Sequence, residues 1–153
     1  MTTLFGMPAH ALLVHAVVVL VPLTAMLEIL CAIWPAARRR LAWLVLAFAV
    51  AVMVFTPLTI QAGEWLFDQQ SRPSAILKTH QARGEWTIYI AAALLIVAIV
   101  QVVQHRKESR SAEPRRMLTV VALVLALVVG IGSTVGMVLI GDTGARSVWG
   151  SRK

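Results

Sequence analysis

Charged side chains are scarce in this sequence of 153 residues. Lys, Arg, Asp and Glu together make up 14% of it, and hydrophobic residues make up 59%. About a quarter charged and about half hydrophobic is usual for a soluble domain. The mean hydropathy of +0.80 agrees with this imbalance. The composition therefore argues against an ordinary water-soluble enzyme and predicts an integral membrane protein.

Cysteine and the common catalytic motifs are also scarce or missing. The single Cys31 excludes an intrachain disulfide and a zinc site built from cysteines, and we expect it to be an apolar structural thiol. The sequence contains no nucleophile elbow and no phosphate loop. The first nine residues lack the positive charge of a signal peptide, so we expect the first apolar segment to stay in the mature protein. These absences favour a protein without enzymatic activity.

Four long apolar stretches dominate what the sequence does contain. They are nearly free of charge and cover residues 9–34, 41–62, 86–104 and 117–140. A membrane-spanning helix needs roughly 20 apolar residues. We therefore predict an all-α fold, a four-helix transmembrane bundle that forms a single integral membrane domain over residues 1–153.

The positive charges indicate how this bundle is oriented. Eight of the fourteen cations lie in the connections after the first and the third apolar stretch: Arg38, Arg39, Arg40, Arg106, Lys107, Arg110, Arg115 and Arg116. The positive-inside rule places these connections in the cytoplasm and both termini outside. Because the cations lie beside apolar segments, the net charge of +7 indicates anchoring in a lipid bilayer rather than binding to nucleic acid.

The connection between the second and third apolar stretches is longer and more regular than a loop. Ile60, Trp65 and Leu66 continue a helical stripe, and Pro73 or Ser74 is well placed to begin the next helix. We therefore predict that the second and third helices extend on the outer side as a short amphipathic hairpin.

Three of the four histidines, His10, His15 and His80, fall on the predicted outer side. His10 and His15 are separated by about 7.5 Å along a helix and roughly 140° around it, so each faces a different neighbour. Polar and aromatic residues predicted at a similar depth are Glu64, Glu85, Asp142, Arg146 and Trp149. Such a cluster could bind a haem or a metal, relay protons, or form a hydrogen-bonded lid on the bundle.

Two further features lie within the predicted spans. Glu28 is an acid deep in the first span, where we expect it to be protonated, paired or turned toward the bundle interior, with either a structural or a proton-handling role. Gly132 and Gly136 form a pair of small residues in the fourth span. Such a pair could allow close packing within the bundle, make room for a flat cofactor, or mediate self-association. His105 ends the third span beside cations, where it suits the headgroup region.

The segment 141–150 has an unusual composition after the fourth span. Gly141 and Gly144 frame Asp142, which predicts a sharp turn at the end of the helix. Trp149 suits the headgroup belt. The segment could close the outer face or form part of a binding site.

With these residues in view, the chain resembles a family of small bacterial predicted membrane proteins classed as a domain of unknown function. Segment 10–17 (His-Ala-Leu-Leu-Val-His-Ala-Val) is similar to the family's His-Pro-x-x-Val-His-Phe-Pro opening, without its two prolines. Gly63-Glu64-x-Leu66 and the ending Gly-Asp-Thr-Gly-Ala-Arg at 141–146, with Trp149-Gly150, also resemble the family pattern. The resemblance implies a four-helix domain in the bacterial cytoplasmic membrane with its signature residues near one face, and it implies no activity.

Three functions remain open from the sequence. The first is a non-enzymatic membrane component whose outer polar face docks a protein partner. The second is a redox module that holds a b-type haem or a metal, with His15 and His80 as first candidate ligands and His10 as the alternate. The third is a small ion or proton transporter that uses Glu28 and the histidines. Nothing in the sequence indicates an oligomeric state.

Overall fold

The computed structural model describes residues 3–4, 7–110 and 116–150. Its helices are α1 (Ala9–Ile33), α2 (Pro35–Asp68), α3 (Ala75–Glu85), α4 (Thr87–Arg110) and α5 (Arg116–Trp149). Before them, β1 (Thr3–Leu4) and β2 (Met7–Pro8) pair as a minimal antiparallel ribbon. The predicted all-α four-helix fold is confirmed, and four helical stretches are long and apolar enough to span a membrane.

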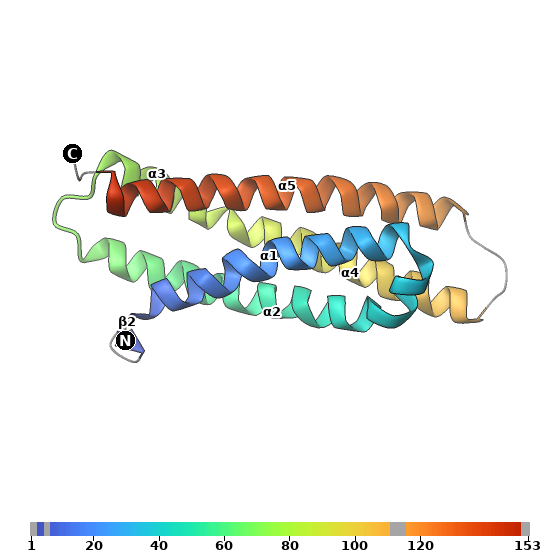
Figure 1. Ribbon diagram of the computed structural model, residues 1–153. Helices are drawn as coiled ribbons and strands as arrows, with labels where there is room; N and C mark the ends of the chain where they lie inside the picture. The colour runs from blue at the N-terminus through green and yellow to red at the C-terminus, as the bar shows by residue number, and fades with distance from the viewer. Residues whose placement is uncertain (1–2, 5–6, 111–115, 151–153) are drawn as a thin grey trace.

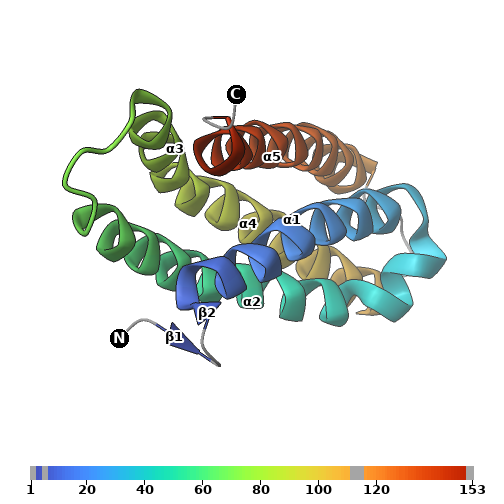
Figure 2. The ribbon, with the colours of Figure 1, turned by 60° about the vertical axis from the view of Figure 1, so that its left-hand side comes forward.

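The four long helices form an elongated bundle (Figure 1). α1 packs against α2 and α5, and α4 packs against the same two helices, while α3 lies along the last part of α5 (Figure 2). Both termini and the α2–α3 connection lie at one end, which we call the terminal end. The end of α1, the beginning of α2, the end of α4 and the beginning of α5 lie at the other end, which we call the basic end. The arrangement brings His10 and His80, distant in sequence, to the same end.

Small side chains allow the helices to approach closely in the core. Gly130 of α5 is buried, and a Cβ there would lie 2.9 Å from Ile29 Cδ1 and 3.4 Å from the carbonyl oxygen of Ala25. A Cβ on Gly136 would lie 3.0 Å from Ile90 Cδ1. Gly132 faces open space instead, so its predicted role in packing within the bundle is wrong. The reason is its place on the exposed face of α5, two residues from the buried Gly130.

Several helix boundaries differ from the sequence prediction. A single residue, Trp34, separates α1 from α2, because Pro35 is well suited to the first turn of a helix. Arg38, Arg39 and Arg40 therefore lie within α2 and not in a loop. Helix α5 continues through residues 141–149, so the predicted sharp turn at its glycines is wrong. Trp86 separates α3 from α4, which divides the third predicted helix in two.

The predicted hairpin corresponds to the last part of α2, which ends at Asp68, and to α3, which begins at Ala75. Ser74 caps α3 and its hydroxyl accepts a hydrogen bond from the backbone amide of Leu77 at 3.2 Å. This agrees with a helix start near Pro73 or Ser74. Projection of this hairpin from a membrane stays a prediction.

The charge pattern predicted that Arg38 is an exposed anchoring residue. This prediction is wrong, because the residue is only 1% exposed. Its guanidinium forms a two-point ion pair with Glu108 of α4, with Nη2–Oε1 at 2.6 Å and Nε–Oε2 at 3.2 Å. Its Nη1 donates to the carbonyl oxygen of Cys31, the last turn of α1, at 2.8 Å. A charge in an apolar interior must be paired, and this pair joins α1, α2 and α4 at the basic end.

We predict that Glu108→Gln destabilises the bundle by about 3–5 kcal/mol, because it leaves the Arg38 guanidinium buried without a counter-charge. Glu85→Gln, at an exposed position, is the matched control and should cost less than about 0.5 kcal/mol. Equilibrium unfolding in mixed detergent micelles measures both. Equal losses for the two variants would contradict the role of the ion pair.

Candidate functional site

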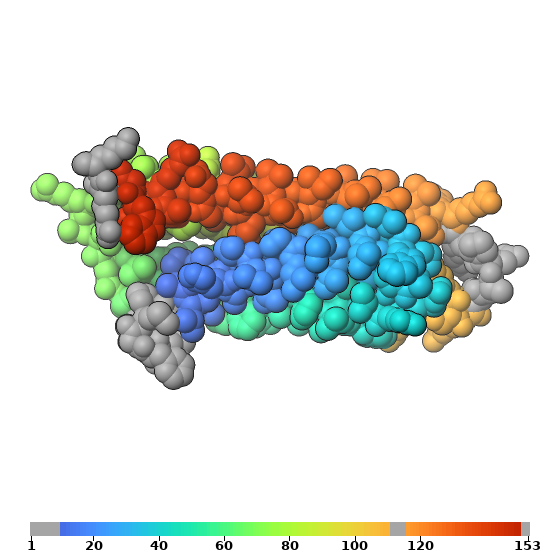
Figure 3. All heavy atoms as spheres, in the orientation of Figure 1, coloured from blue at the N-terminus to red at the C-terminus, as the bar shows by residue number. Residues whose placement is uncertain are grey.

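The terminal end of the bundle contains a cavity of about 810 Å³. In the space-filling view a hollow separates the beginning of α1 from the end of α5 (Figure 3). Most of its lining is apolar and comes from α1, α2, α3 and α5, with Val14, Ile60, Phe67, Leu77 and Met137 among its residues. Its size lies within the range of roughly 300–1,000 Å³ that small-molecule and cofactor sites occupy.

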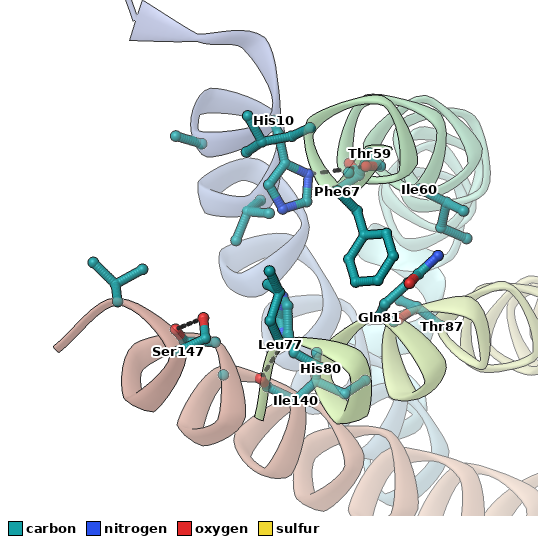
Figure 4. A pocket seen from close by; sticks show the side chains of 18 of the residues that line it. His10, Thr59, Ile60, Phe67, Leu77, His80, Gln81, Thr87, Ile140 and Ser147 are labelled. Atoms are coloured by element: carbon teal, nitrogen blue, oxygen red, sulfur yellow. Dashed lines mark hydrogen bonds between the residues drawn. The ribbon is translucent and has the colours of Figure 1, made fainter. Parts of the chain in front are cut away.

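His10 enters this cavity from α1 and is fastened to α2 (Figure 4). Its Nδ1 lies 3.0 Å from the carbonyl oxygen of Thr59. The ring lies against Gly63, where a Cβ would be only 2.9 Å from Cε1. The missing side chain of Gly63 therefore leaves room for the imidazole of His10, since a Cβ there would displace the ring.

His80 enters the cavity from α3 and is fastened to α5 in the same manner. Its Nδ1 lies 3.2 Å from the carbonyl oxygen of Ile140 (Figure 4). The ring lies against Gly144, where a Cβ would be 2.9 Å from Cε1. In both sites the accepting carbonyl belongs to residue i and the glycine to residue i+4 of the neighbouring helix. The same local construction thus holds two histidines, from different helices, in one cavity.

These contacts determine which ring nitrogen carries the proton. A backbone carbonyl can only accept a hydrogen bond, so Nδ1 of each ring is the donor. In a neutral imidazole the other nitrogen, Nε2, then has a free lone pair. An imidazole whose Nδ1–H is held by a backbone carbonyl is the usual form of a metal-ligating histidine. His10 and His80 are therefore both prepared to act as Nε2 ligands.

His15 also lines the cavity but differs from this pair. It is exposed, and its Nδ1 bonds the carbonyl oxygen of Ala11 in its own helix rather than a neighbouring helix. The sequence ranked His15 with His80 as first candidates and His10 as the alternate. The geometry favours His10 with His80.

The structure divides the remaining predicted outer-face residues into two groups. Glu64, Glu85 and Trp149 line the cavity and are exposed at its edge. Asp142 and Arg146 form an exposed ion pair with each other at 3.0 Å and do not line it. Neither Glu28 nor His105 lines the cavity.

Sequence reasoning missed the residues that hold the histidines. Thr59 and Ile140 contribute backbone carbonyls, which leave no trace in the amino-acid sequence. Gly63 and Gly144 do leave a trace, because each is a glycine inside a helix, where glycine is unfavourable. A glycine within a predicted helix, at the end of the bundle where the histidines gather, could thus have indicated these contacts.

We predict that Gly144→Ala and Gly141→Ala, in the same helix, have different effects on stability. Alanine at either position gains about 1 kcal/mol of helix propensity. At Gly144 the new Cβ displaces His80 and breaks its hydrogen bond, which loses about 1 kcal/mol, whereas at Gly141 it enters open space. Unfolding in detergent should show Gly141→Ala as the more stable. In a His80→Ala background this difference should vanish, and its persistence would contradict the proposed contact.

The comparisons with known proteins agree with this architecture. No curated protein and no solved structure matches the chain. One family, described as "Predicted membrane protein (DUF2231)", matches residues 6–152, which is nearly the whole chain and includes both cavity histidines and both of their glycines. The chain therefore belongs to the DUF2231 family of predicted membrane proteins.

Proposed function

We propose that this protein is a non-enzymatic redox component of the membrane that binds a b-type haem in the cavity at its terminal end, with His10 and His80 as the two axial ligands. The observation that carries the proposal is the repeated construction around these histidines. Each donates Nδ1–H to a helix carbonyl, and each therefore has an Nε2 lone pair for a metal in the same cavity.

The donor set favours haem over a bare metal ion. Protein sites for zinc use three or four protein ligands. Within the described part of the chain, no group of three or more His, Cys, Asp or Glu side chains is placed to hold a metal. Haem needs only one or two axial protein ligands, because the macrocycle supplies the other four nitrogens. Two fastened imidazoles from α1 and α3 match this requirement.

The lining of the cavity suits the same ligand. Apolar side chains such as Val14, Phe67 and Leu77 are suitable neighbours for a macrocycle. Arg72 lies at the edge of the cavity, where a guanidinium can pair with a carboxylate of the haem. If both histidines held the iron, no position on it would remain open for a substrate, which favours electron transfer over catalysis.

We predict that the protein purified from haem-supplemented cells shows a Soret band with the spectrum of a six-coordinate, low-spin haem. His10→Ala and His80→Ala should each abolish the low-spin spectrum, because each removes one axial ligand. His15→Ala and His105→Ala are the matched controls and should retain it. Gly144→Ala, which moves the His80 ring without removing it, should weaken haem affinity by roughly 10- to 100-fold.

Absence of haem from supplemented wild-type protein, shown by absorption and by metal analysis, would overturn the proposal. Retention of the low-spin spectrum in both His10→Ala and His80→Ala would overturn the ligand assignment. Loss of the spectrum in His15→Ala alone would restore the ligand pair ranked first from the sequence.

We also propose that the basic end faces the cytoplasm and that the haem cavity lies near the outer surface of a cytoplasmic membrane. The exposed cations at the basic end support this orientation, among them Arg39, Arg40, Arg106 and Arg110. Arg38 is not one of these exposed cations, since it is buried and paired with Glu108.

Cysteine labelling of intact cells tests this orientation. Ser71→Cys, exposed at the terminal end, should react with a membrane-impermeant maleimide in intact cells. Ser109→Cys, exposed at the basic end, should react only after the cells are opened. The native Cys31 is 0% exposed and provides a low background. The reverse labelling pattern would contradict the proposed orientation.

A further inference from the structure

A second set of buried polar side chains occupies the basic half of the bundle, away from the haem cavity. Glu28 of α1 and Gln101 of α4 are 0% exposed, and Gln104 of α4 is 1% exposed. Gln101, Gln104 and Glu108 are spaced by three and four residues, so they share one face of α4. That face is turned toward the interior, where Cys31, Val45, Ala49 and Ala98 form an apolar cluster.

The carboxyl group of Glu28 has no described partner. Neither of its oxygens has a hydrogen-bond donor among the residues that the structure describes. Gln101 lies beside Glu28, since its Nε2 donates to the backbone carbonyl of Glu28 at 2.7 Å. The remaining amide oxygens, Gln101 Oε1 and Gln104 Oε1, are also buried without a described donor. Four buried acceptor oxygens in this part of the bundle therefore lack a described donor.

Among residues 7–110 and 116–150, no cationic side chain forms an ion pair with Glu28. On α1 the neighbouring titratable group is Cys31, one turn away, and on α2 it is Arg38, whose guanidinium is bound by Glu108 and by the carbonyl of Cys31. On α4 the charged and titratable groups toward the basic end are His105, Arg106, Lys107, Glu108 and Arg110, and its three cations are exposed, whereas Tyr89 lies near the start of the helix. Helix α5 has no ionisable side chain between Met117 and Gly141. An unpaired charge here would be very costly, so the carboxyl must gain a proton or another cation.

We propose that Glu28 is a proton-binding site inside the membrane, filled from the basic end along the row Gln101, Gln104 and Glu108. The occupied form is the neutral carboxylic acid, and the proton comes from water at the basic end. This site does not depend on the haem proposal, because none of its residues lines the haem cavity.

The contacts along α4 indicate that protons reach Glu28 from the basic end. Gln104 Nε2 donates to Glu108 Oε1 at 3.1 Å, and the Glu108 side chain is 31% exposed. By position along α4, the row therefore runs from Gln101, beside Glu28, to the partly exposed Glu108. Toward the terminal end, Thr24 donates its hydroxyl to the carbonyl of Leu20 at 2.7 Å, and the buried Val21 and Val17 follow. This apolar layer separates Glu28 from the haem cavity.

Infrared spectroscopy of the full-length protein in lipid vesicles tests the occupied state. We expect a carbonyl stretch of a protonated carboxylic acid at neutral pH, and its loss in Glu28→Gln. As a second measurement that needs no variant, the apolar reagent dicyclohexylcarbodiimide, which reacts with protonated carboxyls in membranes, should modify wild-type protein at Glu28, as located by peptide mass spectrometry. A band that persists in Glu28→Gln, or a wild-type protein unmodified at Glu28, would overturn the site.

Hydrogen–deuterium exchange of the same infrared band tests the route. After transfer of the vesicles to D₂O, the band should shift promptly in wild type and more slowly in Gln101→Leu and Gln104→Leu, which remove polar groups from the row. Thr24→Val, on the opposite side of Glu28, is the matched control and should exchange like wild type. Slower exchange in Thr24→Val, or unchanged exchange in both glutamine variants, would overturn access from the basic end.

Discussion

A polar group in the apolar interior of this bundle is costly unless a neighbouring helix or its own backbone offers it a partner. Arg38 shows the constraint most clearly, since its guanidinium reaches Glu108 on α4 and a carbonyl at the end of α1. His10 and His80 obey it through carbonyls of α2 and α5. The polar contacts therefore determine which helices are joined and where, on a scaffold that apolar packing alone would hold less specifically.

Glycine residues allow side chains of neighbouring helices to approach the helix backbone closely. Gly63 and Gly144 each leave the space of one side chain, and an imidazole from another helix fills it. Gly130 serves the core instead, where α5 approaches the backbone of α1 near Ala25. A glycine inside a helix weakens that helix, so its use here is explained by the partner it admits.

The two polar regions lie in opposite halves of the same bundle, and an apolar layer with Val17, Val21, Leu94 and Met137 separates them. The terminal half has a cavity lined by two histidines that bond carbonyls of neighbouring helices, and the basic half has an acid without a described partner beside a row of polar side chains. This separation means that electron transfer near one surface and proton binding from the other would use different residues. It also makes the two proposals independent of each other.

The sequence by itself determined the membrane-spanning class, the four helices and the end at which the histidines gather, because apolar length and charge are local properties. It did not determine that Arg38 is buried, that helix α5 passes through Gly141 and Gly144, or that His10 rather than His15 matches His80. Those outcomes depend on a carboxylate 70 residues away, on an imidazole that occupies the space beside a glycine, and on backbone carbonyls of other helices. Only tertiary structure places such partners together, because spacing along one chain says nothing about which faces of different helices meet.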